Sequence, residues 1–299
     1  MICILSQRHF ERYKKRLALH NIDVCDDPSC CDIWLAEPAL AAKALRQRHQ
    51  PEWIASVYAG VDALIAADLP RNYQLTNIRQ VFGPLMTQYV FAHLLSRMRH
   101  LPRYVEAQRQ QLWQPKGYDS LANQTMVIVG TGNIGQQIAT VATAFGMQVI
   151  GVNTDGRDIS GFERCFATTQ LHEAMSCADV VVSILPSTTH TTALFNQHSF
   201  ATMQPHAGFI NVGRGNSVDI DALITALTTQ QLGFAVLDVF EQEPLPADSP
   251  LWHCPNLTIT PHVAAASFPE QVVGQFVENL QRYQQQQPLQ HLVDLNKGY

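Results

Sequence analysis

The sequence predicts an α/β fold with a doubly wound parallel sheet and a second, smaller α/β domain. From about residue 120, short apolar runs alternate with amphipathic stretches of helical period. This pattern is typical of parallel strands joined by right-handed crossover helices. The runs are almost continuously apolar, as expected for strands that are buried on both faces. The first hundred residues repeat the alternation more weakly, which indicates the smaller domain.

In the larger domain we expect six strands, at Thr125–Val129, Gln148–Val152, Asp179–Leu185, Gly208–Val212, Phe234–Val239 and Leu257–Thr260. The helices expected between them are Gln136–Phe145, Leu171–Cys177 and Ile220–Thr228. In the smaller domain we expect strands at Ile2–Leu5, Asp32–Ala36, Trp53–Val57 and Gln74–Asn77, and helices at His9–Leu19 and Ala39–Arg48. A long helical region from about Pro84 to Leu112, interrupted near Pro102, and a helical tail from about Phe268 complete the chain.

Length and composition exclude several classes of protein. A chain of 299 residues suggests two domains or one large one, and a content of 46% hydrophobic and 15% charged residues excludes a disordered chain. The net charge of −5, without a basic block, argues against a nucleic-acid partner. Two stretches without formal charge, 126–154 and 180–213, contain Gly, Pro, His and Asn and no long apolar run, so we expect no membrane span.

The seven cysteines include the vicinal pair Cys30-Cys31 but no Cys-x-x-Cys motif. The apolar segment at the N-terminus, Met1–Ser6, is too short for the hydrophobic region of a signal peptide. These observations favour reduced thiols in a cytoplasmic protein, and we expect no zinc or other metal site.

The segment Gly130-Thr131-Gly132-Asn133-Ile134-Gly135 fits the G-x-G-x-x-G pattern of the dinucleotide-binding turn in Rossmann sheets. It follows one predicted strand directly and opens the next helix, which makes the match specific. Gly130 would permit the tight turn, Gly132 the approach of a pyrophosphate, and Gly135 the close packing of helix on strand. A glycine-rich turn without a ligand is the alternative.

The second strand of this unit ends at Asn153, where an Asp or Glu would bind a ribose 2′-hydroxyl. Thr154 and Arg157 follow and could hold a 2′-phosphate, whereas Asp155 would oppose one. We therefore expect NAD(P) as cofactor, with NADPH favoured over NADH. The alternative is that Arg157 is a solvated loop charge.

Three chemically active side chains follow three successive strands. They are Arg214, Glu243 and His262. Because open α/β sheets bind ligands at the carboxyl ends of their strands, we expect these side chains along one edge of the sheet. An Arg can hold a carboxylate, a His can exchange a proton near neutral pH, and a Glu can orient that His. Each also has an alternative: a structural ion pair for Arg214, a surface charge for Glu243, and a satisfied loop histidine for His262.

The sequence resembles the NAD(P)-dependent D-isomer-specific 2-hydroxyacid dehydrogenases, and within them the glyoxylate/hydroxypyruvate reductase-like branch. The resemblance covers nearly the whole chain and is carried by the following segments: Tyr58–Asp62, Gly130–Gly135, Leu185–Thr188, Asn211–Gly215, Leu237–Pro246, Pro261–Ser267 and the closing Gly298-Tyr299. Departures are Asn153, Gln88 where a Glu is frequent, and Ala264-Ala265 after the histidine.

This resemblance implies further roles. Arg214 would bind the substrate carboxylate and carbonyl, with Glu243 and His262 as the acid/base pair. The backbone of Ala59 and Gly60 would meet the substrate carboxylate, Asp238 the nicotinamide carboxamide, and Leu185 and Pro186 the adenine pocket. Val212 and Gly213 are further expected cofactor contacts. The smaller domain would be flavodoxin-like and would take the last helix back.

These implications define the expected architecture and activity. We expect a substrate domain of residues 1–97 and 275–299 and a dinucleotide-binding domain of residues 98–274. The expected reaction is hydride transfer from NAD(P)H to a small 2-oxo acid such as glyoxylate or hydroxypyruvate. We also expect a homodimer, although no sequence feature by itself indicates one.

Two other functions stay open at this point. One is a dinucleotide-sensing, corepressor-like protein on the same fold, for which a complete Arg/Glu/His set would be superfluous. The other is a different Rossmann enzyme, such as one that uses S-adenosylmethionine or a sugar nucleotide.

Overall fold

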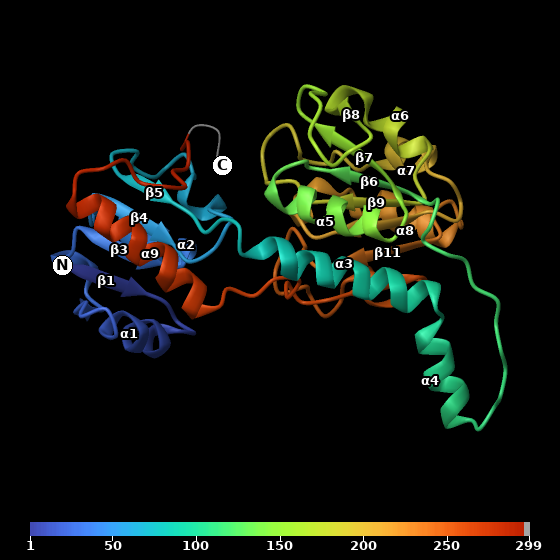
Figure 1. Cartoon of the computed structure of the whole chain (residues 1–299), viewed down its shortest axis with the longest axis horizontal. Coiled ribbons are helices and arrows are strands. Elements are labelled where there is room, and N and C mark those ends of the chain that lie inside the picture. The colour runs from blue at the N-terminus through green and yellow to red at the C-terminus, as the bar shows by residue number, and fades with distance from the viewer. Residues whose placement is uncertain (296–299) are drawn as a thin grey trace. The chain divides into compact units, whose positions relative to one another are not determined.

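The computed structural model describes residues 1–295 and divides into two compact units. The smaller unit consists of Met1–Phe82 and the chain from Ala266 on, and the larger unit consists of Gly83–Ala265. Each unit is built around its own sheet, with helices packed against it (Figure 1).

The larger unit contains a seven-stranded sheet whose recorded strand pairs are all parallel. Its order is β12-β11-β10-β9-β6-β7-β8. The strands are β6 (Thr125–Val129), β7 (Gln148–Asn153), β8 (Arg164–Ala167), β9 (Val180–Ser183), β10 (Gly208–Asn211), β11 (Phe234–Leu237) and β12 (Leu257–Ile259). The order reverses direction between β6 and β9, which is the point where such sheets bind nucleotides. The predicted doubly wound Rossmann sheet is confirmed.

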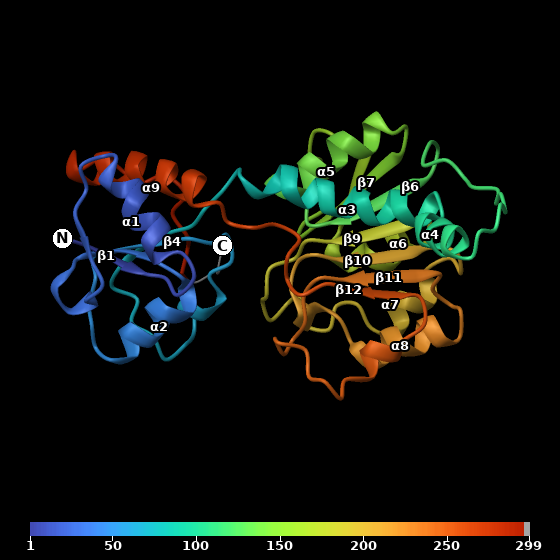
Figure 2. The same cartoon turned by 90° about the horizontal axis from the view of Figure 1, so that it is seen from below.

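Alternate residues of each strand supply two separate cores. Met126 and Ile128 of β6 pack with residues of α3 (Phe82–Met98) and α5 (Asn133–Ala144). Val127 and Val129 of the same strand belong to the opposite core, which includes residues of α6 (Leu171–Ser176), α7 (Gln197–Thr202) and α8 (Ile220–Thr228). Figure 2 shows α3 and α5 on one side of this sheet and α7 and α8 on the other. Burial on both faces explains why the strand sequences are almost continuously apolar.

The smaller unit contains a five-stranded parallel sheet in the order β2-β1-β3-β4-β5, which is the flavodoxin-like order. The strands are β1 (Ile2–Leu5), β2 (Val24–Cys25), β3 (Ile33–Ala36), β4 (Trp53–Ser56) and β5 (Gln74–Thr76). The helices α1 (Phe10–Ala18), α2 (Pro38–Arg46) and α9 (Pro269–Gln284) pack on it.

Helix α9 brings the end of the chain back to the smaller sheet. Phe276 is 2% exposed and its ring stacks on Trp53 of β4 at 5.3 Å between centroids. The ring of Tyr283 also stacks on Trp53, at 5.6 Å between centroids. Asn279 holds the turn after the helix, since its side chain donates to the Gln290 carbonyl and accepts from the Gln290 N–H. Two large aromatic contacts and this turn attach the last helix to the smaller unit.

Every expected strand is present within one or two residues of its expected ends, but three elements were missed. β2 has two residues, and β8 begins with Arg164, so neither is a clear apolar run. The sequence of α7 is Gln-His-Ser-Phe-Ala-Thr, in which only one large residue is apolar. The long helical region breaks at His100, which has φ +53°, and restarts as α4 (Leu101–Arg109) with Pro102 in its first turn.

The unit boundaries lie at 82/83 and 265/266, earlier in both cases than the expected 97/98 and 274/275. The first difference arises because Val90, Phe91 and Leu94 of α3 are buried in a core of the larger sheet. The second arises because Ser267 already donates to the Val57 carbonyl of the smaller unit. Gly298-Tyr299, and the end of the expected 275–299 segment, lie outside the described residues.

The two uncharged stretches noted in the sequence belong to the larger sheet. Residues 126–154 contain β6, α5 and β7, and residues 180–213 contain β9, α7 and β10. Within residues 1–295, every helix is too short or too polar to cross a membrane.

Candidate active site

The glycine-rich turn connects β6 to α5 at the carboxyl edge of the larger sheet. Gly130 has φ +110°, a conformation that residues with a Cβ rarely adopt. A Cβ on Gly135 would lie 2.2 Å from the Gly130 carbonyl oxygen, so this packing of helix on turn requires glycine. A Cβ on Gly132 would meet no atom within 4 Å beyond its chain neighbours. The turn is therefore tight at two glycines and open at the third.

The open side of this turn coincides with the N-terminus of α5. Gly132 occupies the N-cap position and offers no side chain, and no side-chain hydrogen bond caps the helix. The first N–H groups of a helix lack intrahelical partners and lie at the positive end of its dipole. An uncapped N-terminus with free space beside Gly132 fits the phosphates of a dinucleotide.

The loops that follow neighbouring strands are packed backbone against backbone. A Cβ on Gly213 would lie 2.5 Å from the Leu185 amide nitrogen, and one on Gly215 would lie 2.0 Å from the Phe240 carbonyl carbon. Arg214, between these glycines, therefore lies on a loop held between those after β9 and β11. The predicted alignment of these loops along one edge of the sheet is present in the structure.

His262 and Glu243 form a hydrogen-bonded pair after β12 and β11. His262 Nδ1 donates to Glu243 Oε2 at 2.8 Å, and Glu243 Oε1 accepts from the Phe240 N–H at 2.9 Å. The histidine side chain is 53% exposed, and its other ring nitrogen, Nε2, is not used in the bond to Glu243. His262 also has φ +53°, an uncommon conformation for a non-glycine residue and one that recurs at functional sites.

The buried carboxylate of Asp238 holds the segment that carries His262. Its Oδ1 accepts from Thr260 Oγ1 at 2.6 Å and from the Val263 N–H at 2.9 Å. Its Oδ2 accepts from the Ala264 N–H at 2.9 Å, and its main-chain carbonyl accepts from the His262 N–H at 2.8 Å. These bonds make Asp238 a positioning residue for the histidine loop.

The sequence analysis missed two members of this network, Thr260 and Tyr89. The Tyr89 hydroxyl lies 2.5 Å from Thr260 Oγ1, and since Thr260 donates to Asp238, Tyr89 donates to Thr260. Burial raises the pKa of Tyr89 to about 12, which keeps its phenol protonated. The sequence signal for Thr260 was its position directly before Pro261-His262. Tyr89 on α3 is too distant in sequence to be paired with Thr260.

Arg214 is half-buried, and side-chain hydrogen bonds to main-chain carbonyls hold its loop. Its carbonyl accepts from Asn211 Nδ2 at 3.0 Å and Ser217 Oγ at 2.7 Å, and its own Nη1 donates to the Gly213 carbonyl at 2.8 Å. Asn211 and Ser217 are fully buried and were not expected as supporting residues. They fix the backbone from which the guanidinium extends.

Asn153, at the end of β7, is joined to both the glycine turn and the following loop. Its Nδ2 donates to Thr131 Oγ1 at 3.3 Å and to the Arg157 carbonyl at 2.8 Å, and its Oδ1 accepts from the Gly156 N–H at 2.7 Å. Arg157 forms an exposed ion pair with Asp155 at 2.8 Å. Asp155 thus lies against Arg157, and the two charges largely cancel.

Ala59 and Gly60 belong to the smaller unit and follow β4 there. The Ala59 carbonyl accepts from Asn77 Nδ2 at 2.7 Å, and Tyr58 is anchored by hydrogen bonds with Ser56 Oγ. The loop is thus ordered by side chains from its own unit and lies at the carboxyl edge of its own sheet.

Comparison with known proteins identifies the family. Residues 91–264 match the family model described as the D-isomer specific 2-hydroxyacid dehydrogenase NAD binding domain. A glyoxylate/hydroxypyruvate reductase A from Serratia proteamaculans is 31% identical over 262 residues, which cover 85% of this chain and 84% of that protein. The chain belongs to the D-isomer specific 2-hydroxyacid dehydrogenase family.

Solved structures of dehydrogenases in this family share the fold of the whole chain. A family member from Aeromonas salmonicida subsp. salmonicida is 46% identical with a TM-score of 0.92, over 98% of each chain. The NADPH-dependent glyoxylate/hydroxypyruvate reductase from Sinorhizobium meliloti, solved with NADP and sulfate, is 27% identical with a TM-score of 0.88, over 100% and 99% of the chains. The predicted resemblance, fold class and oxidoreductase function are confirmed.

As a 2-hydroxyacid dehydrogenase, the chain uses a nicotinamide dinucleotide, NAD(P), and acts on small 2-oxo or 2-hydroxy acids. The corepressor-like alternative is not favoured. The glycine turn at the N-terminus of α5 lies inside the matched NAD binding domain, as do Arg214, Glu243 and His262.

We predict that Gly132→Ala weakens NAD(P)H binding without affecting the fold. The added methyl group fits the free protein but occupies the space beside the helix N-terminus, so Kd for NADPH should rise about tenfold or more, as for a lost charged hydrogen bond. Fluorescence titration and Tm measure the two effects. Gly117→Ala, at another open glycine, is the control. An unchanged Kd would mean that no phosphate lies beside Gly132.

Proposed function

We propose that this dehydrogenase reduces a small 2-oxo acid, namely glyoxylate, hydroxypyruvate or a close analogue, with NADPH as the preferred cofactor. The observation that carries the proposal is the His262–Glu243 pair, held at the carboxyl edge beside the loop of Arg214. The relatives from Serratia and Sinorhizobium are named as glyoxylate/hydroxypyruvate reductases, which supports the choice of substrate.

In this proposal His262 delivers the proton. Because Nδ1 donates to Glu243, Nε2 is the nitrogen that can give a proton to the oxygen on C2 of the substrate. After the transfer the ring is neutral and keeps its Nδ1 proton on the Glu243 bond. Glu243, itself held by the Phe240 N–H, keeps the ring plane and the tautomer constant through the cycle.

Arg214 takes the electrostatic role. A guanidinium can hold a carboxylate with two parallel hydrogen bonds and stabilise negative charge that develops on the neighbouring oxygen. The N–H groups of Ala59 and Gly60 would bind the same carboxylate. The supported backbone around Arg214 favours this role, because electrostatic stabilisation depends on donors that are in place before the reaction.

The dinucleotide supplies the hydride that forms the new C–H bond at C2. The turn Gly130–Gly135 would bind its pyrophosphate, with Thr131, Asn133 and Ile134 at the start of α5. Leu185 and Pro186 would line the adenine pocket, and Val212, Gly213 and Asp238 would lie along the nicotinamide half. Asp238 retains lone pairs beyond its three side-chain bonds, so positioning the histidine loop does not prevent a contact with a carboxamide.

The preference for NADPH rests on the end of β7. Asn153 leaves no carboxylate at the position that repels a 2′-phosphate, and Thr154 and Arg157 follow within reach. Asp155 is already paired with Arg157, so its charge is opposed locally. The Sinorhizobium relative is named as NADPH-dependent, which supports the same preference.

We also propose a homodimer that forms through α4 and the segment after it. Figure 1 shows this segment extending from its own unit. It carries five exposed apolar residues, Leu101, Val105, Leu112, Trp113 and Tyr118, and Trp113 is 97% exposed. His100 and Tyr104 hold the returning chain by hydrogen bonds to Gly117 and Lys116. An ordered, exposed apolar arm favours burial against the same arm of a second copy.

A cytoplasmic location is part of the same proposal. All seven cysteines lie within the described residues, and each is a free thiol. Unpaired cysteines are the rule in reducing compartments.

We predict that the protein turns over glyoxylate and hydroxypyruvate with NADPH, and that His262→Asn lowers kcat by about 10²–10⁴-fold, the usual contribution of a positioned proton donor. Steady-state kinetics with a panel of 2-oxo acids and both cofactors measures this. His206→Asn is the matched control, because His206 also bonds a carboxylate, Asp179, at 2.7 Å but precedes β10. Near wild-type kcat in folded His262→Asn would exclude His262 as the donor.

We predict that Arg157→Ala lowers kcat/KM for NADPH by about 10–100-fold, as expected for a lost hydrogen bond between charged groups, and leaves that for NADH unchanged. Arg164→Ala is the control, because Arg164 lies at the start of β8 and packs on Phe166. Parent values that are equal or favour NADH would show that Asn153 and its neighbours do not select the phosphate.

We predict that Trp113→Asp raises the dimer dissociation constant by about 30-fold or more, the effect of removing an interface hot spot. Sedimentation equilibrium of the full chain measures the change. Leu19→Asp, at an exposed apolar residue of the smaller unit, should leave the dimer intact. A monomeric parent protein would contradict this interface. So would a dimer whose dissociation constant is unchanged by Trp113→Asp.

A further inference from the structure

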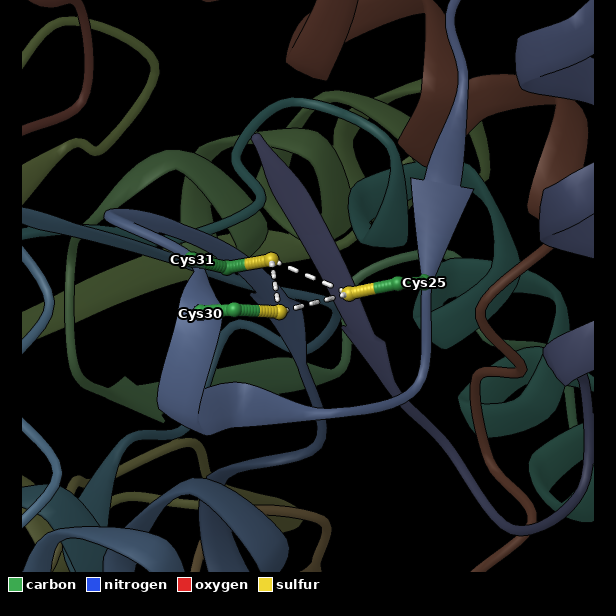
Figure 3. A group of neighbouring side chains, drawn as sticks. All are labelled: Cys25, Cys30 and Cys31. Atoms are coloured by element: carbon green, nitrogen blue, oxygen red, sulfur yellow. Dashed lines mark hydrogen bonds between the residues drawn. The ribbon is translucent and has the colours of Figure 1, made fainter.

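Three cysteines of the smaller unit converge on one point. Figure 3 shows the side chains of Cys25, Cys30 and Cys31 directed toward one another from β2 and from the segment before β3. Their sulfur atoms are separated by 3.0 Å for Cys25–Cys31, 3.8 Å for Cys25–Cys30 and 3.9 Å for Cys30–Cys31. The candidate active-site residues do not use this cluster.

A tight turn produces the convergence. Asp27 caps the short 3₁₀ turn Pro28–Cys30, since its Oδ1 accepts from the Ser29 N–H at 2.8 Å and Pro28 follows directly. The chain thereby reverses and returns Cys30 to Cys25. The thiols of both residues lie 3.4 Å from the Asp27 carbonyl oxygen. The spacing Cys-x4-Cys-Cys therefore brings the sulfurs together although it contains no Cys-x-x-Cys motif.

The cluster lies at the edge of the smaller sheet opposite to the Ala59-Gly60 loop. Cys25 pairs in register with Cys3, near the start of β1, and Ile33, just after Cys31, pairs with Ile2. Ala59 and Gly60 follow the carboxyl end of β4. Because the strands are parallel, the cluster is separated from that loop by the length of the sheet.

The sulfur triangle has the size that a metal ion requires. A tetrahedral zinc–thiolate centre with bonds of about 2.3 Å separates its sulfurs by about 3.8 Å. Two of the three separations already match, and the third must open from 3.0 Å. A disulfide, with a bond of about 2.05 Å, would instead need one pair to close and would leave the third sulfur unexplained.

The cluster is open to solvent at one side. Cys30 is exposed, Cys25 is half-buried and Cys31 is buried. Burial raises the pKa of the Cys31 thiol. Burial also acts to raise the pKa of Cys25, but its hydrogen bonds with Cys31, the Asp27 backbone and Cys30 outweigh burial, so the net shift is downward. A cation can reach the three sulfurs from the exposed side, at Cys30.

We propose that Cys25, Cys30 and Cys31 bind one soft d¹⁰ metal ion, Zn²⁺ or Cu⁺, through their three sulfurs. Thiolates select these ions over hard cations. Binding of the ion releases the thiol protons of its ligands. The fourth position of a zinc ion is left to water or another external ligand. The ion would join β2 to the start of β3 and so stabilise the edge of the smaller sheet.

The test uses the full-length protein, reduced and freed of metal, titrated with Zn²⁺ or with Co²⁺ as a spectroscopic probe, and separately with Cu⁺ against a chelator. We expect one equivalent to bind, thiolate-to-cobalt charge-transfer absorption to appear, and Tm to rise. Cys30→Ser should weaken binding by about 100-fold or more, given the large share of metal affinity that each ligand contributes. Tighter retention of Zn²⁺ or of Cu⁺ distinguishes the two ions.

Cys177→Ser is the matched control, because Cys177 is an exposed cysteine of the larger unit, and it should bind metal like the parent. The readouts are independent of turnover, and Cys30 can be replaced without disturbing a core. Absence of a stoichiometric metal, or equal binding by Cys30→Ser, would overturn the proposal. So would peptide mapping that finds a Cys25–Cys31 disulfide in protein that never binds metal, since the cluster would then be a redox pair.

Discussion

The carboxylate of Asp238 is 1% exposed and accepts three hydrogen bonds from the segment 260–264. A buried carboxylate is tolerated only where such donors replace its water shell, and a donor left unpaired there costs about 1–3 kcal/mol. The segment therefore has one favourable path over the end of β11. That path places His262 in a left-handed conformation, with its ring against Glu243. The orientation of His262 thus depends on the Asp238 carboxylate, which bonds the residues on either side of His262 and not its imidazole ring.

The same edge of the sheet depends on the close approach of its loops. The Cβ positions of Gly213 and Gly215 are filled by the backbone of the two adjoining loops. Loops packed in this way cannot move independently, so the relative positions of Arg214 and Glu243 follow from the sheet register. Protein interiors transmit such constraints because they are close-packed. A rigid edge suits a reaction in which negative charge develops on a substrate oxygen, because the groups that stabilise this charge must be in place beforehand.

Features that depend on residues close together in the sequence were predicted, and features that depend on contacts between distant segments were missed. The strand before Gly130, the helix after it, and the positions of Arg214, Glu243 and His262 after their strands follow from patterns within a few residues. β8 was missed because it has only four residues and begins with Arg164, and the outer strand of a sheet needs less burial. Tyr89 could not be linked to Thr260 because only the packing of α3 on the sheet brings them together. Motif spacing did not group Cys25 with Cys30 and Cys31, because the turn at Asp27-Pro28 decides their proximity.

Two exposed histidines of the larger unit show why a side-chain pair alone does not define a catalytic site. His206 Nε2 bonds Asp179 at 2.7 Å and His262 Nδ1 bonds Glu243 at 2.8 Å, so the two pairs are alike in distance. His206 and Asp179, however, precede β10 and β9, whereas Glu243 and His262 follow β11 and β12. Only the carboxyl edge holds the glycine turn and the N-terminus of α5, where a dinucleotide can bind. The topology of the sheet therefore distinguishes the histidine that we propose as the proton donor from one that only bonds a carboxylate at the surface.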